Sequence, residues 1–219
     1  MTIKARGLVL PLLAGVFALG GCDDGGATAA QPAETRVLLA RGGTAAAGAA
    51  ALSAGLAAAP VSLQDDVSAI EVRVTAVQAL RAGGDAEGEG GWATLRLAAP
   101  AMLDLLKLPT DAASGGVEIA REGLAQGTYG HVRLLVDSAT ITFKREVKVG
   151  QAVYAAGRET PLTIPSGKIR TPVEFTVGAQ SGATIKLVFD ADASVKKVTA
   201  TGASRVMMPP VISARRVQD

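Results

Sequence analysis

The sequence has few of the residues that build disulfides, metal sites or aromatic binding platforms. Its 219 residues include one cysteine, one histidine, one tryptophan and two tyrosines, and aromatic residues make up 3% of the chain. A single cysteine excludes an internal disulfide and every metal site built from cysteine pairs. With one histidine, a zinc site would need mostly carboxylate ligands, which is uncommon. Trp92, Tyr129 and Tyr154 are too few for the usual stacked sugar platform.

An excess of charge of one sign is also missing. Lys and Arg number 22 and Asp and Glu number 20, which gives a formal net charge of +2. Residues 1–21, which we interpret below as a removable signal, hold Lys4 and Arg6 and no acid, so 20 basic and 20 acidic residues remain without them. No basic stripe is left to neutralise a phosphate backbone, and nucleic-acid binding is therefore not expected.

No apolar run is long enough to cross a membrane comfortably. The run 7–19 (GLVLPLLAGVFAL) is shorter than the ~20 residues that a spanning helix needs. Lys4 and Arg6 precede it and two glycines follow it, which is the layout of a secretory signal. We therefore expect residues 1–21 to be a signal peptide and the mature protein to have no transmembrane helix.

The segment 19–22 (LGGC) resembles the lipobox of bacterial lipoproteins, in which a leucine, two small residues and a cysteine are recognised together. The resemblance implies cleavage before Cys22, a diacylglyceryl group on its sulfur and acylation of the new amino terminus. Several acyl chains, at ~0.8 kcal/mol per buried methylene, anchor a protein to a membrane. Asp23 favours the inner membrane in some such lipoproteins, and other sorting rules leave the outer membrane open. The alternative is an ordinary signal peptide with an incidental cysteine.

Composition divides the remaining chain into a tether, a domain and a tail. Residues 22–50 are rich in Gly and Ala, and their few large apolar residues, at 37–39, cannot offset the entropy of ordering. The sequence therefore predicts a lipidated N-terminus and flexible tether over 22–50. We expect one domain over residues 51–213 and a C-terminal tail over 214–219.

The domain has the alternating pattern of β-strands. Segment 69–77 (AIEVRVTAV) places Ile70, Val72 and Val74 on one face and polar residues on the other. Eight to ten short runs of this kind, separated by Gly, Pro, Ser and Asp, predict an all-β fold, an antiparallel β-sandwich or barrel. Segment 100–108 (PAMLDLLKL) differs, because its apolar residues have helical spacing between two prolines, and we expect one short helix there.

The order of several motifs resembles that of an uncharacterised family of bacterial lipoprotein and secreted domains. The motifs are LAAAPVS (56–62), IEVRVTAV (70–77), Trp92, LDLLKL (103–108), GTYGHVRLLV (127–136), LVFDADASV (187–195) and MPPVI (208–212). The resemblance covers about residues 51–213 and implies a sandwich of the prealbumin or immunoglobulin type. It implies no catalytic residue, and Ala58 stands where the pattern usually has an acid.

One group of oxygen ligands has the spacing of a metal site. Asp190, Asp192 and Ser194 recur at every second residue where a predicted strand ends, and would project to one side. Such oxygens can hold Ca²⁺, with Asp137 or the pair at 65–66 as further ligands. The segment lacks the turn glycine and distal glutamate of an EF-hand. A solvated polar strand end is the simpler interpretation.

Other polar features also have a structural interpretation beside a functional one. The loop 83–91 (GGDAEGEGG) has the charge to bind cations or a basic partner, and we favour a soluble hairpin connection. His131 lies in a strand, and no G-x-S-x-G elbow accompanies it, so a hydrogen-bonded histidine is preferred over a nucleophilic triad. Tyr129 is expected to bond to backbone as in a tyrosine corner, and Trp92 to lie in the core or at its rim.

Together these patterns predict a lipid-anchored β-domain of the bacterial cell envelope that acts as a binding or interaction module, with no enzymatic activity. Its expected partners are the membrane, through the lipid on Cys22, and an envelope protein or polysaccharide, with the periplasmic and cell-surface sides both open. The alternatives are an assembly subunit, marked by an exposed apolar edge near residues 162–164 or the helix, and an envelope hydrolase, which would need a Ser or Asp beside His131.

Overall fold

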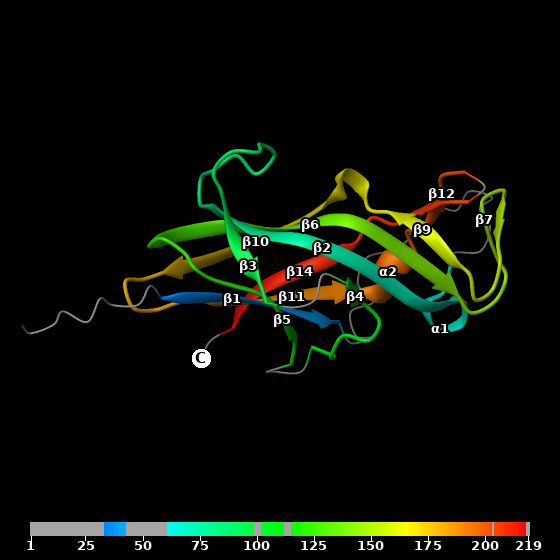
Figure 1. Ribbon diagram of the computed structural model, residues 1–219, viewed down its shortest axis with the longest axis horizontal. Helices are drawn as coiled ribbons and strands as arrows, with labels where there is room; N and C mark the ends of the chain where they lie inside the picture. The colour runs from blue at the N-terminus through cyan, green and yellow to red at the C-terminus, as the bar shows by residue number, and fades with distance from the viewer. Residues whose placement is uncertain (1–32, 43–60, 99–101, 112–114, 203, 218–219) are drawn as a thin grey trace, which may run out of the picture. The chain divides into compact units, whose positions relative to one another are not determined.

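The computed structural model describes residues 33–42, 61–98, 102–111, 115–202 and 204–217, all within the compact unit Gln31–Asp219. Strands make up most of this part of the chain, and its helices are short (Figure 1). They are α1 (Leu63–Asp66), α2 (Ala191–Val195) and the 3-10 turn η1 (Pro165–Gly167). The all-β prediction is confirmed, and the assignment to a prealbumin or immunoglobulin sandwich stays a prediction. None of the described helices has the length and apolarity needed to span a membrane.

Twelve strands are joined by hydrogen bonds into one sheet, in the order β12-β13-β9-β6-β2-β3-β5-β1-β11-β14, with β10 also on β6 and β4 also on β2. The strands β7 and β8 form a separate pair. The bounds are β1 Glu34–Arg41, β2 Val67–Arg81, β3 Trp92–Leu97, β4 Met102–Asp104, β5 Val117–Gly123, β6 Gly127–Phe143, β7 Val147–Val149, β8 Ala152–Tyr154, β9 Glu159–Thr163, β10 Lys168–Val177, β11 Thr184–Asp190, β12 Thr199–Ala200, β13 Val206–Met207 and β14 Val211–Val217.

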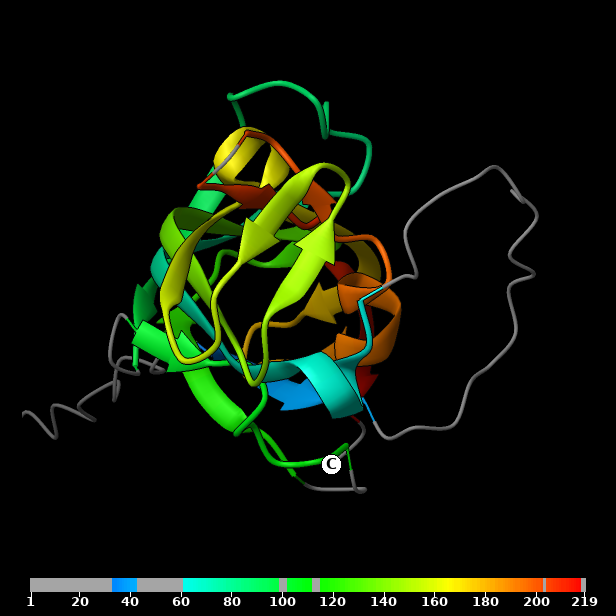
Figure 2. The same cartoon turned by 90° about the vertical axis from the view of Figure 1, so that its right-hand side faces the viewer.

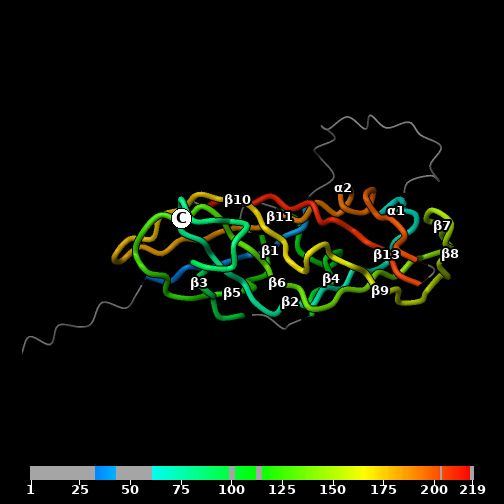
Figure 3. The backbone as a smooth tube through the Cα atoms, turned by 90° about the horizontal axis from the view of Figure 1, so that it is seen from above, coloured from blue at the N-terminus to red at the C-terminus, as the bar shows by residue number. Residues whose placement is uncertain are grey.

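The sheet is mixed and curls around its own core (Figure 2). Most neighbouring strands are antiparallel, as predicted, but β1 runs parallel to β11 and β13 runs parallel to β9. The long strands β2 and β6 form the longest ladder, and their inward side chains include Val72, Val77, Leu134 and Ile141. The helices α1 and α2 pack together at the end of the sheet that lies nearest to the separate pair β7 and β8 (Figure 3).

Alternation along the strands separates a core face from an outer face. In β10, Ile169, Thr171 and Val173 are buried, whereas Lys168 and Arg170 are partly exposed. This is the period-two pattern of a strand with one face against the core. The two cations of β10 therefore lie on the outer face of the sheet.

The predicted tether is wrong over residues 34–41, which form β1. This strand lies between β5 and β11, and its side chains Val37 and Leu39 are 1% exposed. The segment has too few apolar residues to form a core alone, but the neighbouring strands enclose those it has. The predicted domain start at residue 51 is too late, because β1 already belongs to the sheet. The predicted tail over 214–219 is also corrected, because β14 continues through residue 217.

The predicted helix over 100–108 is also wrong where the structure describes it. Residues 102–104 form β4, which pairs with the edge of β2. Leu103 and Leu105 are buried while Met102 is 43% exposed, so the burial follows period two. The Asp104 carboxylate accepts a hydrogen bond from the Leu106 N–H at 3.0 Å, a local bond that competes with helix formation.

Candidate functional site

A row of four polar side chains crosses the outer face of the sheet. Thr94 of β3 lies opposite Gln78 of β2, Gln78 opposite Arg133 of β6, and Arg133 opposite Arg170 of β10. Gln78 Nε2 donates to Thr94 Oγ1 at 2.9 Å, and Arg133 Nε donates to Gln78 Oε1 at 2.7 Å. We call these four residues, with Lys168 two positions before Arg170, the polar row. The register of four strands therefore fixes the positions of three cations.

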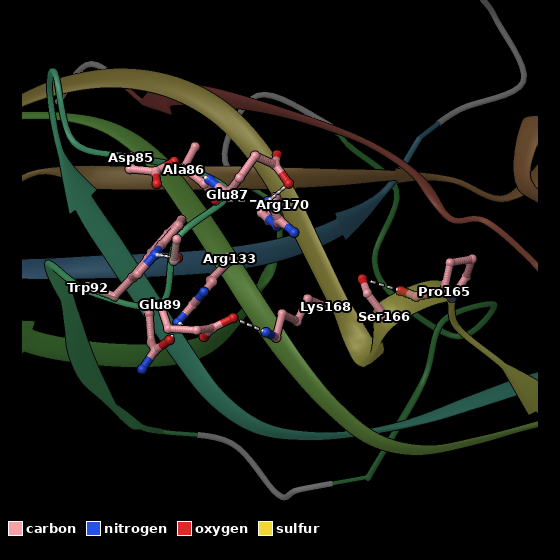
Figure 4. Close-up of polar contacts among 12 residues, drawn as sticks. Asp85, Ala86, Glu87, Glu89, Trp92, Arg133, Pro165, Ser166, Lys168 and Arg170 are labelled. Carbon is pink, nitrogen blue, oxygen red and sulfur yellow. Dashed lines mark hydrogen bonds and ion pairs between the residues drawn. The ribbon is translucent and has the colours of Figure 1, made fainter.

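The acidic loop 82–91, between β2 and β3, folds over the polar row (Figure 4). Glu89 pairs with Arg133 at 3.2 Å and also with Lys168. Glu87 pairs with Arg170 at 2.5 Å. Each cation of the row thus faces a carboxylate of the same loop.

The loop is also held through its backbone. Arg170 Nη1 donates to the carbonyl of Ala86 at 2.8 Å, and the indole N–H of Trp92 donates to the carbonyl of Gly88 at 3.0 Å. The guanidinium of Arg133 lies 4.1 Å from the centroid of the Trp92 ring, which is a cation–π contact. The site therefore contacts both the carboxylates and the main chain of an acidic peptide.

Burial is very unequal across these ion pairs. The side chain of Arg133 is 4% exposed, whereas those of Glu89 and Glu87 are 67% and 84% exposed. Arg133 is fixed by Gln78 and Trp92, which belong to the sheet, and the two glutamates extend from a loop. The cationic half of the site is thus built into the fold, and the anionic half lies at the surface.

The cations also change the titration of the loop. The pKa of Glu89 lies below the ordinary value of 4.5, chiefly because Lys168 donates a hydrogen bond to its carboxylate. The positive charges of Lys168 and Arg133 act in the same direction, and desolvation opposes them. Glu89 is therefore ionised at neutral pH, as its ion pairs require.

Glycines mark both ends of the acidic loop. Gly83 and Gly91 each have a φ of 78°, a backbone conformation that glycine adopts at little cost. Between them, Asp85 Oδ1 accepts a hydrogen bond from the Glu87 N–H at 3.0 Å. The segment therefore has a turn at its tip and a flexible residue type at each end.

A second row of cations continues the outer face beyond β3. Arg96, two residues after Thr94, lies opposite Arg121 of β5, and Arg121 lies opposite Arg36 of β1. Arg121 pairs with Glu118 at 2.8 Å and with Glu34 at 3.5 Å. Hydrogen bonding to Arg121 lowers the pKa of Glu118. We call Arg96, Arg121 and Arg36 the arginine row.

The geometry predicted for calcium at Asp190, Asp192 and Ser194 is wrong. Residues 191–195 form α2, and alternate residues of a helix do not share a face. Asp190 caps this helix by accepting from the Ala193 N–H at 2.8 Å, and Ser194 Oγ accepts from the Val211 N–H at 2.8 Å. Asp190 ends the strand and caps the helix that follows it. The spacing of polar residues at every second position had suggested that the strand continued.

The environment of Asp192 also differs from a calcium site. This residue lines a hollow of about 440 Å³ together with the cations Arg41 and Lys144. Of the other suggested ligands, Asp66 pairs with Arg145 at 2.7 Å and accepts from the Ser62 N–H. Within the described residues, no three His, Cys, Asp or Glu side chains are grouped so as to hold a metal ion.

The remaining sequence predictions have different outcomes. Tyr129 donates from its hydroxyl to the Ala125 carbonyl at 2.9 Å and stacks on Phe175, so its structural role is confirmed. His131 lies in β6 opposite Leu80, and no hydrogen bond in the described part of the chain joins it to a Ser or Asp side chain. Cys22 lies outside the described residues.

Of the two apolar edges named for an assembly subunit, the one near residues 162–164 is not exposed. Leu162 and Ile164 are each 6% exposed and belong to the core. Sequence reasoning instead missed the polar row and the arginine row. The sequence did contain a sign of these rows, namely cations at outward positions of several predicted strands and a loop of opposite charge. Only the register of the strands, however, shows that those cations lie together.

Fold and site together define an all-β domain with a cationic outer face partly covered by its own acidic loop. Residues 49–210 match the DUF4382 family, described as a domain of unknown function, and the chain belongs to this family. The matched range begins after β1. Comparison with curated proteins finds no match, and comparison with solved structures finds none either.

Proposed function

We propose that this protein is a lipid-anchored binding module of the bacterial cell envelope and that the polar row is its binding surface. The lipid anchor is supported by the sequence alone, through the LGGC segment after a charged and then apolar N-terminus. The binding role is supported by the geometry of the outer face. These two parts of the proposal are tested separately.

The position of β1 limits how far the domain reaches from a lipid on Cys22. Eleven residues separate Cys22 from Glu34, where β1 begins. A fully extended chain spans at most about 3.6 Å per residue, so this connection reaches about 40 Å. The proposed display is therefore close to the membrane surface, closer than a tether extending to residue 50 would allow.

One observation carries the binding role: Arg133 is almost fully buried, stacked on Trp92 and directly opposite a second arginine, Arg170. Burying a charge costs free energy, and an apolar side chain at the same place is often neutral or stabilising. Like charges directly opposite on paired strands also destabilise a sheet. Stability does not require these cations, because an apolar pair at the same place would need no carboxylates to neutralise it, whereas recognition of an anionic ligand does require them.

The anchor is tested on native protein from membranes. Mass spectrometry is expected to find acylated Cys22 as the first residue, and Cys22→Ser is expected to move the protein out of the membrane fraction. An unmodified N-terminus at another residue contradicts the anchor.

The binding surface is tested by site-directed photocrosslinking in intact membranes. Benzoylphenylalanine at Pro172, exposed two residues after Arg170, is expected to give a discrete adduct, and the same group at Lys148 of β7 is not. Arg170→Gln is expected to abolish the adduct, while Arg216→Gln on β14 leaves it. Equal adducts from both positions, or an adduct that survives Arg170→Gln, contradict the assignment of the surface.

A further inference from the structure

We infer that the polar row binds an acidic peptide segment of a partner protein, and that the loop 82–91 occupies this site in the free protein as an internal competitor. The inference rests on the proposed function, because it names the ligand of the same surface. It goes further in assigning the loop a second state, in which its carboxylates leave the cations.

The groups that already fill the site belong to a short acidic stretch of peptide. Glu87 and Glu89 are carboxylates two residues apart on one short stretch of peptide. The site also donates hydrogen bonds to two main-chain carbonyls of that stretch, from Arg170 to Ala86 and from Trp92 to Gly88. An acidic polysaccharide carries the carboxylates but has no regular series of amide carbonyls. The contacts therefore favour an acidic peptide.

The strands of the sheet set where the cations lie. Arg133 is held by the Gln78 amide and the Trp92 ring, and Gln78 is held in turn by Thr94. Arg170 and Lys168 stand in register on β10. A peptide that displaces the loop therefore meets an Arg133 that Gln78 still holds and two further cations on the neighbouring strand, which reduces the entropic cost of binding.

The two carboxylates of the loop lie at the surface. They are mostly exposed, so water can solvate them as soon as they leave the cations. Glycines with positive φ at both ends allow the segment between them to swing away. Because the loop is covalently attached, its effective concentration is on the order of millimolar, so a partner must present several contacts at once to replace it.

The outer face offers more contacts than the loop uses. The arginine row continues the positive face past β3, and its outermost members, Arg96 and Arg36, are exposed. A longer acidic segment would reach cations that the loop does not cover. Such a partner outcompetes the loop because it gains these additional pairs.

The test uses Trp92, the only tryptophan of the chain, as a reporter inside the site. Purified full-length protein in neutral detergent is titrated with the peptide acetyl-DAEGE-amide, which copies residues 85–89, and with acetyl-NAQGQ-amide, which lacks the charges. Glu87→Gln/Glu89→Gln frees the site of its internal carboxylates. This variant is expected to bind the acidic peptide at least about tenfold more tightly than the wild type, because affinity scales with the fraction of open protein.

A charge-matched control separates displacement from general electrostatics. Glu146→Gln/Glu159→Gln removes the same number of acids at exposed positions outside both rows and leaves the loop intact, so its affinity is expected to stay within about twofold of the wild type. Adding Arg170→Gln to Glu87→Gln/Glu89→Gln is expected to remove most of the gain. If the double variant does not fold, Glu89→Gln alone is titrated and is expected to show an intermediate gain.

Each remaining outcome overturns the inference in a distinguishable way. Equal peptide affinity of Glu87→Gln/Glu89→Gln and wild type contradicts the role of the loop. Binding of a polygalacturonate oligomer without binding of the peptide contradicts the ligand class and leaves the binding surface standing. Absence of any response to either probe overturns the inference, while the proposed function is judged by the crosslink from position 172 in membranes.

Discussion

Arg133 and Arg170 lie directly opposite each other in the ladder between β6 and β10, so two cations share one face of the sheet. Like charges in this position repel each other across the ladder. Glu89 and Glu87 of the acidic loop neutralise them from above. The loop therefore stabilises the sheet as well as covering the site, and these two effects are separable by measurement.

Removing the loop carboxylates is expected to lower the thermal stability and to make it depend on salt. In Glu87→Gln/Glu89→Gln the repulsion between Arg133 and Arg170 is no longer compensated, so Tm falls below that of the wild type. Raising the NaCl concentration screens the repulsion and narrows the difference. Thermal unfolding followed by circular dichroism at 20 mM and 500 mM NaCl measures both effects, and a salt-independent difference would contradict the electrostatic cause.

Acid is expected to open the loop. Lys168 and Arg133 lower the pKa of Glu89, and the pair of Glu87 with Arg170 lies beside it. The ion pairs of Glu89 therefore contribute fully to stability above the ordinary pKa of 4.5. This contribution is lost as the pH falls through the lower pKa of the folded state. Trp92 fluorescence is therefore expected to stay constant from pH 7 to 5 and to change below pH 4.5. Glu89→Gln is expected to lack this transition, and far-UV circular dichroism distinguishes loop opening from acid unfolding.

The strand β1 is expected to be indispensable for folding. A chain that begins at residue 49, where the match to the family starts, lacks a strand that lies between β5 and β11, and we expect it not to fold. Within the full chain, Leu39→Ala is expected to lower the free energy of unfolding by about 3 kcal/mol, as for other buried leucines. Leu38→Ala, at a half-buried position of the same strand, is the control and is expected to cost less. A cooperative transition in the truncated chain would restore the tether interpretation.

Tyr129 offers a smaller and more local prediction. Tyr129→Phe keeps the stack on Phe175 but removes the hydroxyl that donates to the Ala125 carbonyl. The loss of one such hydrogen bond is expected to lower the free energy of unfolding by about 1 kcal/mol. Urea unfolding measures it, and Tyr129→Ala, which also removes the stack, is expected to cost several times more.

The all-β class could be predicted because apolar and polar residues alternate in strands that bury one face, as the buried residues Ile70, Val72 and Val74 show. It failed where the neighbours of a segment decide its structure. Val37 and Leu39 are too few to form a core, yet β5 and β11 enclose them. The apolar residues at 103 and 105 fit a helix and a strand equally, and the free edge of β2 decides between the two.

The candidate site was largely hidden for a related reason. The loop was visible as a run of Gly, Asp and Glu, but the cations beneath it come from β6 and β10, far apart in the sequence. Only the register of the paired strands places Arg133 beside Gln78 and Arg170, and the pattern of one strand does not reveal which residues of its neighbours lie opposite. Conversely, the spacing of Asp190 and Asp192 suggested a metal site, whereas the capping bond of Asp190 makes the segment helical.

The buried pair between Lys186 and Asp111 gives the last prediction. Lys186 in β11 is fully buried, and its ammonium lies 3.3 Å from the Asp111 carboxylate, which Arg215 also contacts at 2.6 Å. Asp111→Asn removes a charged partner of the buried ammonium and is expected to lower the free energy of unfolding by about 2 kcal/mol. Lys186→Met is expected to cost clearly less, because Asp111 is partly exposed and keeps Arg215 as its partner. Urea unfolding of both variants compares them directly, and equal losses would show that the charge of Asp111 does not stabilise the buried ammonium.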